Sequence, residues 1–124
     1  MLVDDETDFL EALVKRLTKR KLNVTAASGG PQALQMLAEQ PVDVIVLDVK
    51  MPQMDGMQAL REIKKIQPSA EVIMLTGHAD LEAAIQGMEL GAFDYLMKPA
   101  DIDELLYKIQ DAYKKKKTKN AAGL

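Results

Sequence analysis

Val44-Ile45-Val46-Leu47 is an uninterrupted apolar run that ends at the carboxylate of Asp48. A strand with one solvent-exposed face alternates apolar and polar residues, whereas a strand covered on both faces is apolar throughout. Two further runs that are apolar throughout, Val72 to Leu75 and Tyr95 to Met97, follow along the chain. These three runs predict the central strands of a sheet that is covered by helices on both sides.

Apolar residues at helical spacing lie between the runs. Leu10, Leu13 and Leu17 recur at this spacing, and similar patterns occur within residues 33–38, 57–66, 84–88 and 102–112. Two less regular segments, Met1 to Val3 and Asn23 to Ala26, complete five repeats of a strand followed by a helix. This order predicts an α/β fold with a parallel sheet.

Length and composition restrict the classes of function. With 124 residues, the chain fits one domain, which we expect over residues 1–117, with 118–124 as a tail or the start of a linker. The net charge of -3 argues against nucleic acid as a direct partner. The absence of cysteine excludes disulfides and thiolate chemistry. No signal peptide or apolar stretch of membrane-spanning length is found, so we expect a cytoplasmic protein that does not bind a membrane.

Polar side chains follow the predicted strands at the points where they end. Asp4 and Asp5 follow the first strand, Asp48 the third, Thr76 the fourth and Lys98 the fifth. The carboxyl ends of parallel strands meet at one edge of a sheet, where ligands bind. Three carboxylates and one lysine sum to a charge of about -2, and carboxylates are suitable ligands for Mg²⁺. The pattern therefore predicts a Mg²⁺ site that could also hold a phosphoryl group.

These residues and their neighbours resemble the receiver domains of two-component response regulators, the CheY-like family. The resemblance rests on Asp4-Asp5-Glu6, Asp48 followed by Met51-Pro52 and Asp55-Gly56, Thr76-Gly77, and Gly91-Ala92-Phe93-Asp94-Tyr95 leading to Lys98-Pro99. Within this family, the motifs most resemble those of receivers that belong to sigma-54-dependent regulators. The resemblance implies a flavodoxin-like three-layer fold with strand order 2-1-3-4-5.

The resemblance also implies a role for each residue. Asp48 would be the phosphoacceptor, and Thr76 and Lys98 would hold the phosphoryl oxygens. Asp5, Asp48 and the backbone carbonyl of Lys50 would coordinate Mg²⁺, with Asp4 acting through water. Tyr95 would be the switch aromatic that responds to Thr76, and Lys98-Pro99 would be a cis peptide.

The implied partners are a sensor histidine kinase as phosphoryl donor and an output domain or partner protein. A homodimer through the fourth helix, fifth strand and fifth helix is the preferred arrangement, and a face made by the first and fifth helices is the alternative. Such a chain is a switch that assists its own phosphorylation and dephosphorylation rather than an enzyme. A binding module that does not depend on phosphorylation is an alternative. An aspartyl-phosphate hydrolase is another, but Lys50 stands where such enzymes carry a second aspartate.

Two features remain open at this stage. His78 follows Thr76 closely and either gates water near the phosphoryl group or is a solvated loop residue. The first predicted strand, Met1 to Val3, is short for a strand with neighbours on both sides, so we expect a chain that starts late or a truncated start.

Overall fold

The computed structural model describes residues 1–122, together with the side chains of all of these except His78 and residues 119–122. Its elements are β1 (Leu2–Val3), α1 (Thr7–Lys19), β2 (Ala26–Ala27), α2 (Gly30–Leu37), β3 (Val44–Asp48), α3 (Gly56–Ile66), β4 (Glu71–Thr76), the short 3-10 helix η1 (His78–Asp80), α4 (Leu81–Glu89), β5 (Asp94–Met97) and α5 (Ile102–Ala122). No helix in this part of the chain combines the length and the apolar character that crossing a membrane requires.

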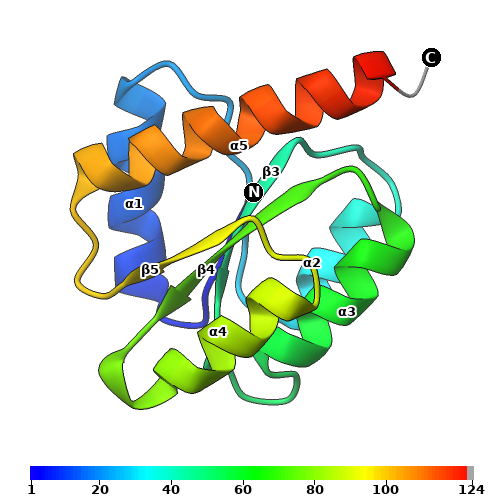
Figure 1. The fold of residues 1–124 in the computed structure, drawn as a ribbon. Helices are drawn as coiled ribbons and strands as arrows, with labels where there is room; N and C mark the ends of the chain where they lie inside the picture. The colour runs from blue at the N-terminus through cyan, green and yellow to red at the C-terminus, as the bar shows by residue number, and fades with distance from the viewer. Residues whose placement is uncertain (123–124) are drawn as a thin grey trace.

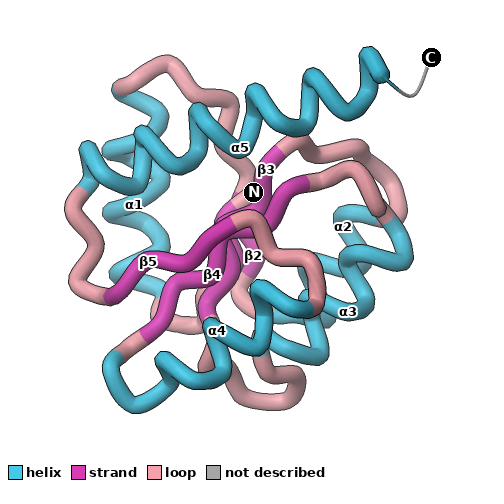
Figure 2. Tube along the Cα trace, in the orientation of Figure 1, coloured by secondary structure: helices cyan, strands magenta, loops and turns pink. Residues whose placement is uncertain are grey.

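The five strands form one parallel sheet in the order β2-β1-β3-β4-β5, as predicted. Figures 1 and 2 show the sheet through the middle of the molecule, with α1 and α5 on one side and α2, α3 and α4 on the other. Successive side chains of β3 and β4 point to opposite faces. Ile45, Leu47 and Met74 therefore pack toward α2, α3 and α4, whereas Val46 and Ile73 pack toward α1 and α5.

The second strand differs from its predicted position. Residues 23–26 were predicted as a strand, but β2 consists of Ala26 and Ala27. The reason is the length of its neighbour, because β1 offers only Leu2 and Val3 for pairing and these lie opposite Ala26 and Ala27. Asn23 and Val24 precede the paired region and lack a strand partner within the described part of the chain.

Helix α5 is longer than the sheet that it covers. It runs from Ile102 to Ala122, so the expected domain boundary between residues 117 and 118 falls inside a continuous helix. Lysines along α5 pair with acidic residues at the amino-terminal side of three strands. Lys108 pairs with Asp94, Lys115 with Glu71 and Lys116 with Asp43.

Candidate functional site

Three strands bring charged side chains together at the carboxyl edge of the sheet. Carboxyl oxygens of Asp4, Glu6 and Asp48 lie within 4.8 Å of one another. Asp4 follows β1 and Asp48 is the last residue of β3, and both are at least 95% buried, since their exposed fractions are 3% and 5%. The central position of β1 and β3 in the sheet thus places two carboxylates side by side and out of water.

Lys98 supplies the positive charge of this cluster. Its Nζ lies 3.0 Å from Asp4 Oδ2, 3.5 Å from Asp48 Oδ1 and 3.5 Å from Glu6 Oε1. The ammonium also lies 4.7 Å from the centre of the Phe9 ring, which adds a cation–π contact. The Lys98 backbone N–H donates to the Thr76 carbonyl at 2.8 Å, and the Lys98-Pro99 peptide bond is cis. One lysine is therefore shared among three carboxylates.

Burial and charge alter the acidity of this cluster. Burial, together with the charge of Asp4, raises the pKa of Asp48 to about 6, although Lys98 and the backbone amide of Lys50 oppose the rise. Burial alone would lower the pKa of Lys98, but its hydrogen bond to Asp4 and the surrounding carboxylates outweigh this effect and raise it. The charged form of Asp48 is therefore less favourable here than in water, and a nearby cation would stabilise it.

The donor set fits a divalent cation. Three carboxylates, of which Asp4 and Asp48 are buried and Glu6 is exposed, and one ammonium leave a net charge of about -2, which a divalent ion would neutralise. Carboxylate oxygens are the ligands that Mg²⁺ prefers, and a divalent ion beside Asp48 would offset the burial that raises the pKa of this side chain. We find this combination of geometry and charge once among the described residues.

Asp5 and Glu6 both lie exposed in the turn after β1. The resemblance assigns Asp5 to the metal, but Asp5 does not belong to the group of three carboxylates. Glu6, which the sequence analysis did not single out as a ligand, supplies the third carboxylate oxygen. Its backbone N–H donates to Asp4 Oδ1 at 2.9 Å, so the turn after β1 folds back on Asp4. Lys50 lies exposed in the loop after β3.

Thr76 and Tyr95 lie on neighbouring strands, on the side of the sheet that faces α4. Thr76 is fully buried, and its hydroxyl donates to the carbonyl of Gly77 at 3.0 Å. Tyr95 lies opposite Met74 rather than at the end of β5, and its half-buried ring packs against the cluster beneath α4. Met74 and Thr76 are two residues apart and share one face. The His78 side chain, considered above as a water gate, lies outside the described residues.

Known proteins resemble this chain in sequence. A family model described as "Response regulator receiver domain" matches residues 1–110. The transcriptional regulatory protein GlrR of Escherichia coli strain K12 is 40% identical over 112 residues, which is 90% of this chain and 25% of that protein. The DNA-binding transcriptional regulator NtrC of the same strain is 40% identical over 111 residues, 90% of this chain and 24% of NtrC. The chain thus spans about a quarter of the length of these curated relatives.

A solved structure agrees in fold as well as in sequence. The crystal structure of a response regulator receiver domain protein from Clostridium thermocellum superimposes with a TM-score of 0.90 at 41% identity, and the alignment covers 94% of each chain. The likeness in both sequence and fold therefore extends over almost the whole chain.

Proposed function

Because this chain belongs to the response regulator receiver domain family of two-component signalling, we propose that it is a switch whose Asp48 accepts a phosphoryl group from a sensor histidine kinase. The observation that supports Asp48 is its position: it is a buried carboxylate at the end of a central strand, 3.5 Å from the Lys98 ammonium. Receiver domains of this family act with histidine kinases, and we place the exchange in the cytoplasm.

In the proposed reaction, an Asp48 carboxylate oxygen forms a bond to phosphorus while the bond between phosphorus and the imidazole nitrogen of the donor breaks. The electron pair of that bond stays on the imidazole. Lys98 is placed to pair with the new phosphoryl oxygens, since its ammonium already contacts Asp48 and Asp4. Thr76 is placed to donate its hydroxyl hydrogen to them after giving up the Gly77 carbonyl. These groups act by holding charge, as phosphoryl transfer requires.

A bound Mg²⁺ would neutralise charge on the carboxylates and on the transferred group. Asp48 and Asp4 are positioned to hold it, the latter directly or through water, with the Lys50 carbonyl as a further oxygen. The family resemblance adds Asp5, whereas the geometry adds Glu6. Magnesium titration of Asp5→Asn and Glu6→Gln separates these possibilities, because the variant that lacks a ligand should lose affinity and the other should retain it.

The phosphoacceptor assignment is tested with a small phosphodonor, such as acetyl phosphate, and Mg²⁺. Intact mass spectrometry should show one added phosphoryl group, which EDTA and Asp48→Asn should both abolish. Asp8→Asn, which changes an exposed carboxylate on α1, is the matched control and should behave as the parent chain does. Addition of the phosphoryl group to Asp48→Asn would refute the assignment.

We further propose that the chain is a phosphoacceptor and not an enzyme acting on another substrate, and that it signals through the surface of α4, β5 and α5. This surface carries exposed Ile85 and Met88 on α4, Leu90 directly after α4, and Tyr107 on α5, the last with 70% of its area exposed. Such residues suit contact with a second copy or with an output domain. Analytical ultracentrifugation with beryllofluoride should show stronger self-association in the parent chain than in Thr76→Ala. Equal shifts in both would refute a route through Thr76 and Tyr95.

A further inference from the structure

The Phe9 ring contacts the ammonium of Lys98 at the border of the carboxylate cluster. Phe9 lies in the first turn of α1, which begins directly after Glu6. Its half-buried side chain packs against the apolar cluster between the sheet and helices α1 and α5, and the ring centre lies 4.7 Å from Lys98 Nζ. A cation at this distance is attracted by the electron density on the face of the ring. Phe9 is thus a neutral partner for an ammonium that also contacts three carboxylates.

The carboxylates are the partners of Lys98 for which a divalent cation competes. Lys98 Nζ lies 3.0 Å from Asp4 Oδ2 and 3.5 Å from oxygens of Glu6 and Asp48. The same three residues form the group that fits Mg²⁺. Because a hard cation selects oxygen ligands, the ion pairs of Lys98 weaken when Mg²⁺ is bound, whereas an aromatic ring is not a ligand for this ion. The contact with Phe9 is therefore retained when the ion pairs are weakened.

The side chain of Lys98 is free to move unless a partner holds it. Its backbone N–H donates to the Thr76 carbonyl at 2.8 Å, which holds the main chain. The side chain is a flexible four-carbon stem that ends in a point charge, and 21% of it is exposed. A ring against the ammonium excludes water on the side of α1 and limits the positions of the charge. A charge that is already in place before the reaction stabilises the transition state without a cost of reorganisation.

We infer that Phe9 is a positioning residue for phosphoryl transfer, whose ring keeps the Lys98 ammonium beside Asp48 while the carboxylates hold a cation. The inference rests on the proposed function of Asp48 as phosphoacceptor. Phe9 acts through Lys98 and takes no part in making or breaking bonds. A leucine at this position would fill similar space against the apolar cluster, but it would offer the ammonium no electron-rich face.

Fluorination of the Phe9 ring separates this electrostatic role from a packing role. Each fluorine withdraws electron density from the face of the ring while the shape changes little, so phenylalanines with one, three and five fluorines at this position weaken the contact in steps. We expect the rate constant for phosphorylation by acetyl phosphate to fall in the same order, by about threefold to tenfold over the series. Phe9→Leu should match the fully fluorinated ring, and Phe9→Tyr, which keeps an electron-rich ring, should retain the parent rate.

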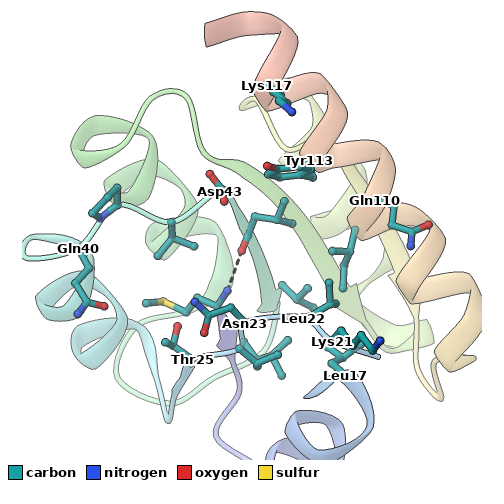
Figure 3. A pocket seen from close by; sticks show the side chains of 18 of the residues that line it. Leu17, Lys21, Leu22, Asn23, Thr25, Gln40, Asp43, Gln110, Tyr113 and Lys117 are labelled. Atoms are coloured by element: carbon teal, nitrogen blue, oxygen red, sulfur yellow. Dashed lines mark hydrogen bonds between the residues drawn. The ribbon is translucent and has the colours of Figure 1, made fainter. Parts of the chain in front are cut away.

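Phe93 provides the matched control. Its ring lies 5.5 Å from Lys115 Nζ, which is the same kind of contact, but Lys115 pairs with Glu71 at the amino-terminal edge of the sheet. Figure 3 shows this opposite edge, where Asp43 and Lys117 of α5 line a cavity. The fluorinated series at Phe93 should leave the phosphorylation rate unchanged.

A second readout does not depend on phosphorylation. The ring current of Phe9 should shift the NMR signals of the Lys98 ε-methylene protons upfield, with and without Mg²⁺, and Phe9→Leu should abolish the shift. Loss of the shift when Mg²⁺ is added to the parent chain would overturn the inference, as would a phosphorylation rate that does not respond to fluorination of Phe9 or responds equally at Phe93. A parent chain that shows the shift but accepts no phosphoryl group would instead refute the proposed function, and with it the role of Phe9 in transfer.

Discussion

Gly56 is the first residue of α3, and we expect Gly56→Ala to disrupt the carboxylate cluster through the backbone. A Cβ atom at this position would lie 2.6 Å from the Asp48 carbonyl oxygen and 2.6 Å from the Val49 Cα. Ordinary contact begins at 3.4 Å, so the start of α3 would have to move by about 0.8 Å relative to the end of β3. Both obstacles are main-chain atoms, which cannot rotate away. Overpacking of this kind costs roughly 1 to 3 kcal/mol.

Gly87→Ala is the matched control, because it makes the same chemical change at a position where a Cβ atom has room. Its Cβ would meet side chains of Leu60 and Met74 at 3.6 Å, which is ordinary contact, within helix α4. Alanine is favoured over glycine inside a helix by about 1 kcal/mol, so this variant should be more stable than the parent chain.

Urea unfolding followed by circular dichroism measures both variants. We expect the midpoint to fall for Gly56→Ala and to rise for Gly87→Ala, with unchanged slopes. Gly56→Ala should also reduce phosphorylation by a small phosphodonor, since Asp48 lies on the displaced backbone. If both variants shifted in the same direction, the argument from the close approach of Gly56 to β3 would fail.

Two further predictions concern pH and the hydrogen bonds of the Gln67 side chain. Since the pKa of Asp48 is raised from 3.8 to about 6, the folded chain holds a proton that the unfolded chain releases between about pH 4 and 6, and stability falls as pH rises through this window. In EDTA, Asp48→Asn should therefore raise the melting temperature more at pH 7 than at pH 4, and an equal rise would contradict the assigned pKa. The Gln67 side chain accepts from Val42 N–H at 2.9 Å and donates to the carbonyls of Leu37 at 2.9 Å and Gln40 at 2.6 Å. Gln67→Ala should lose about 1 to 3 kcal/mol in urea unfolding, whereas Gln86→Ala on exposed α4 should change stability by less than about 0.5 kcal/mol.

The layered architecture could be predicted because burial on both faces leaves a clear signal. The run Val44 to Leu47 is apolar at every position, and the structure places β3 there, at the centre of the sheet. The edge strand β2 gave no such signal, since its pairing depends on how many residues β1 offers. Ala26 and Ala27 form a strand because they pair with Leu2 and Val3. This pairing joins residues far apart in the sequence, so the residues around β2 do not reveal it.

The candidate site could be predicted as a set of residues but not in its detailed geometry. Asp4, Asp48 and Lys98 meet because parallel strands end at one edge, and this follows from strand order alone. Which of Asp5 and Glu6 brings a carboxylate oxygen close to Asp4 and Asp48 depends on the bend between β1 and α1, where consecutive residues point in different directions. The acidic run after Val3 was the signal available for Glu6, but it did not distinguish one carboxylate from the next.

Helix α5 connects the two edges of the sheet mechanically. It starts three residues after Pro99, beside the carboxylate cluster, and its 21 residues span roughly 30 Å at about 1.5 Å per residue. A rod of that length that tilts by about 10° around its middle moves each end by roughly 3 Å. The ion pairs of Lys108, Lys115 and Lys116 resist this tilt at three successive points. A shift of Lys98 on ligand binding would thus be transmitted along α5 to the ion pair between Lys116 and Asp43, at the opposite edge of the sheet.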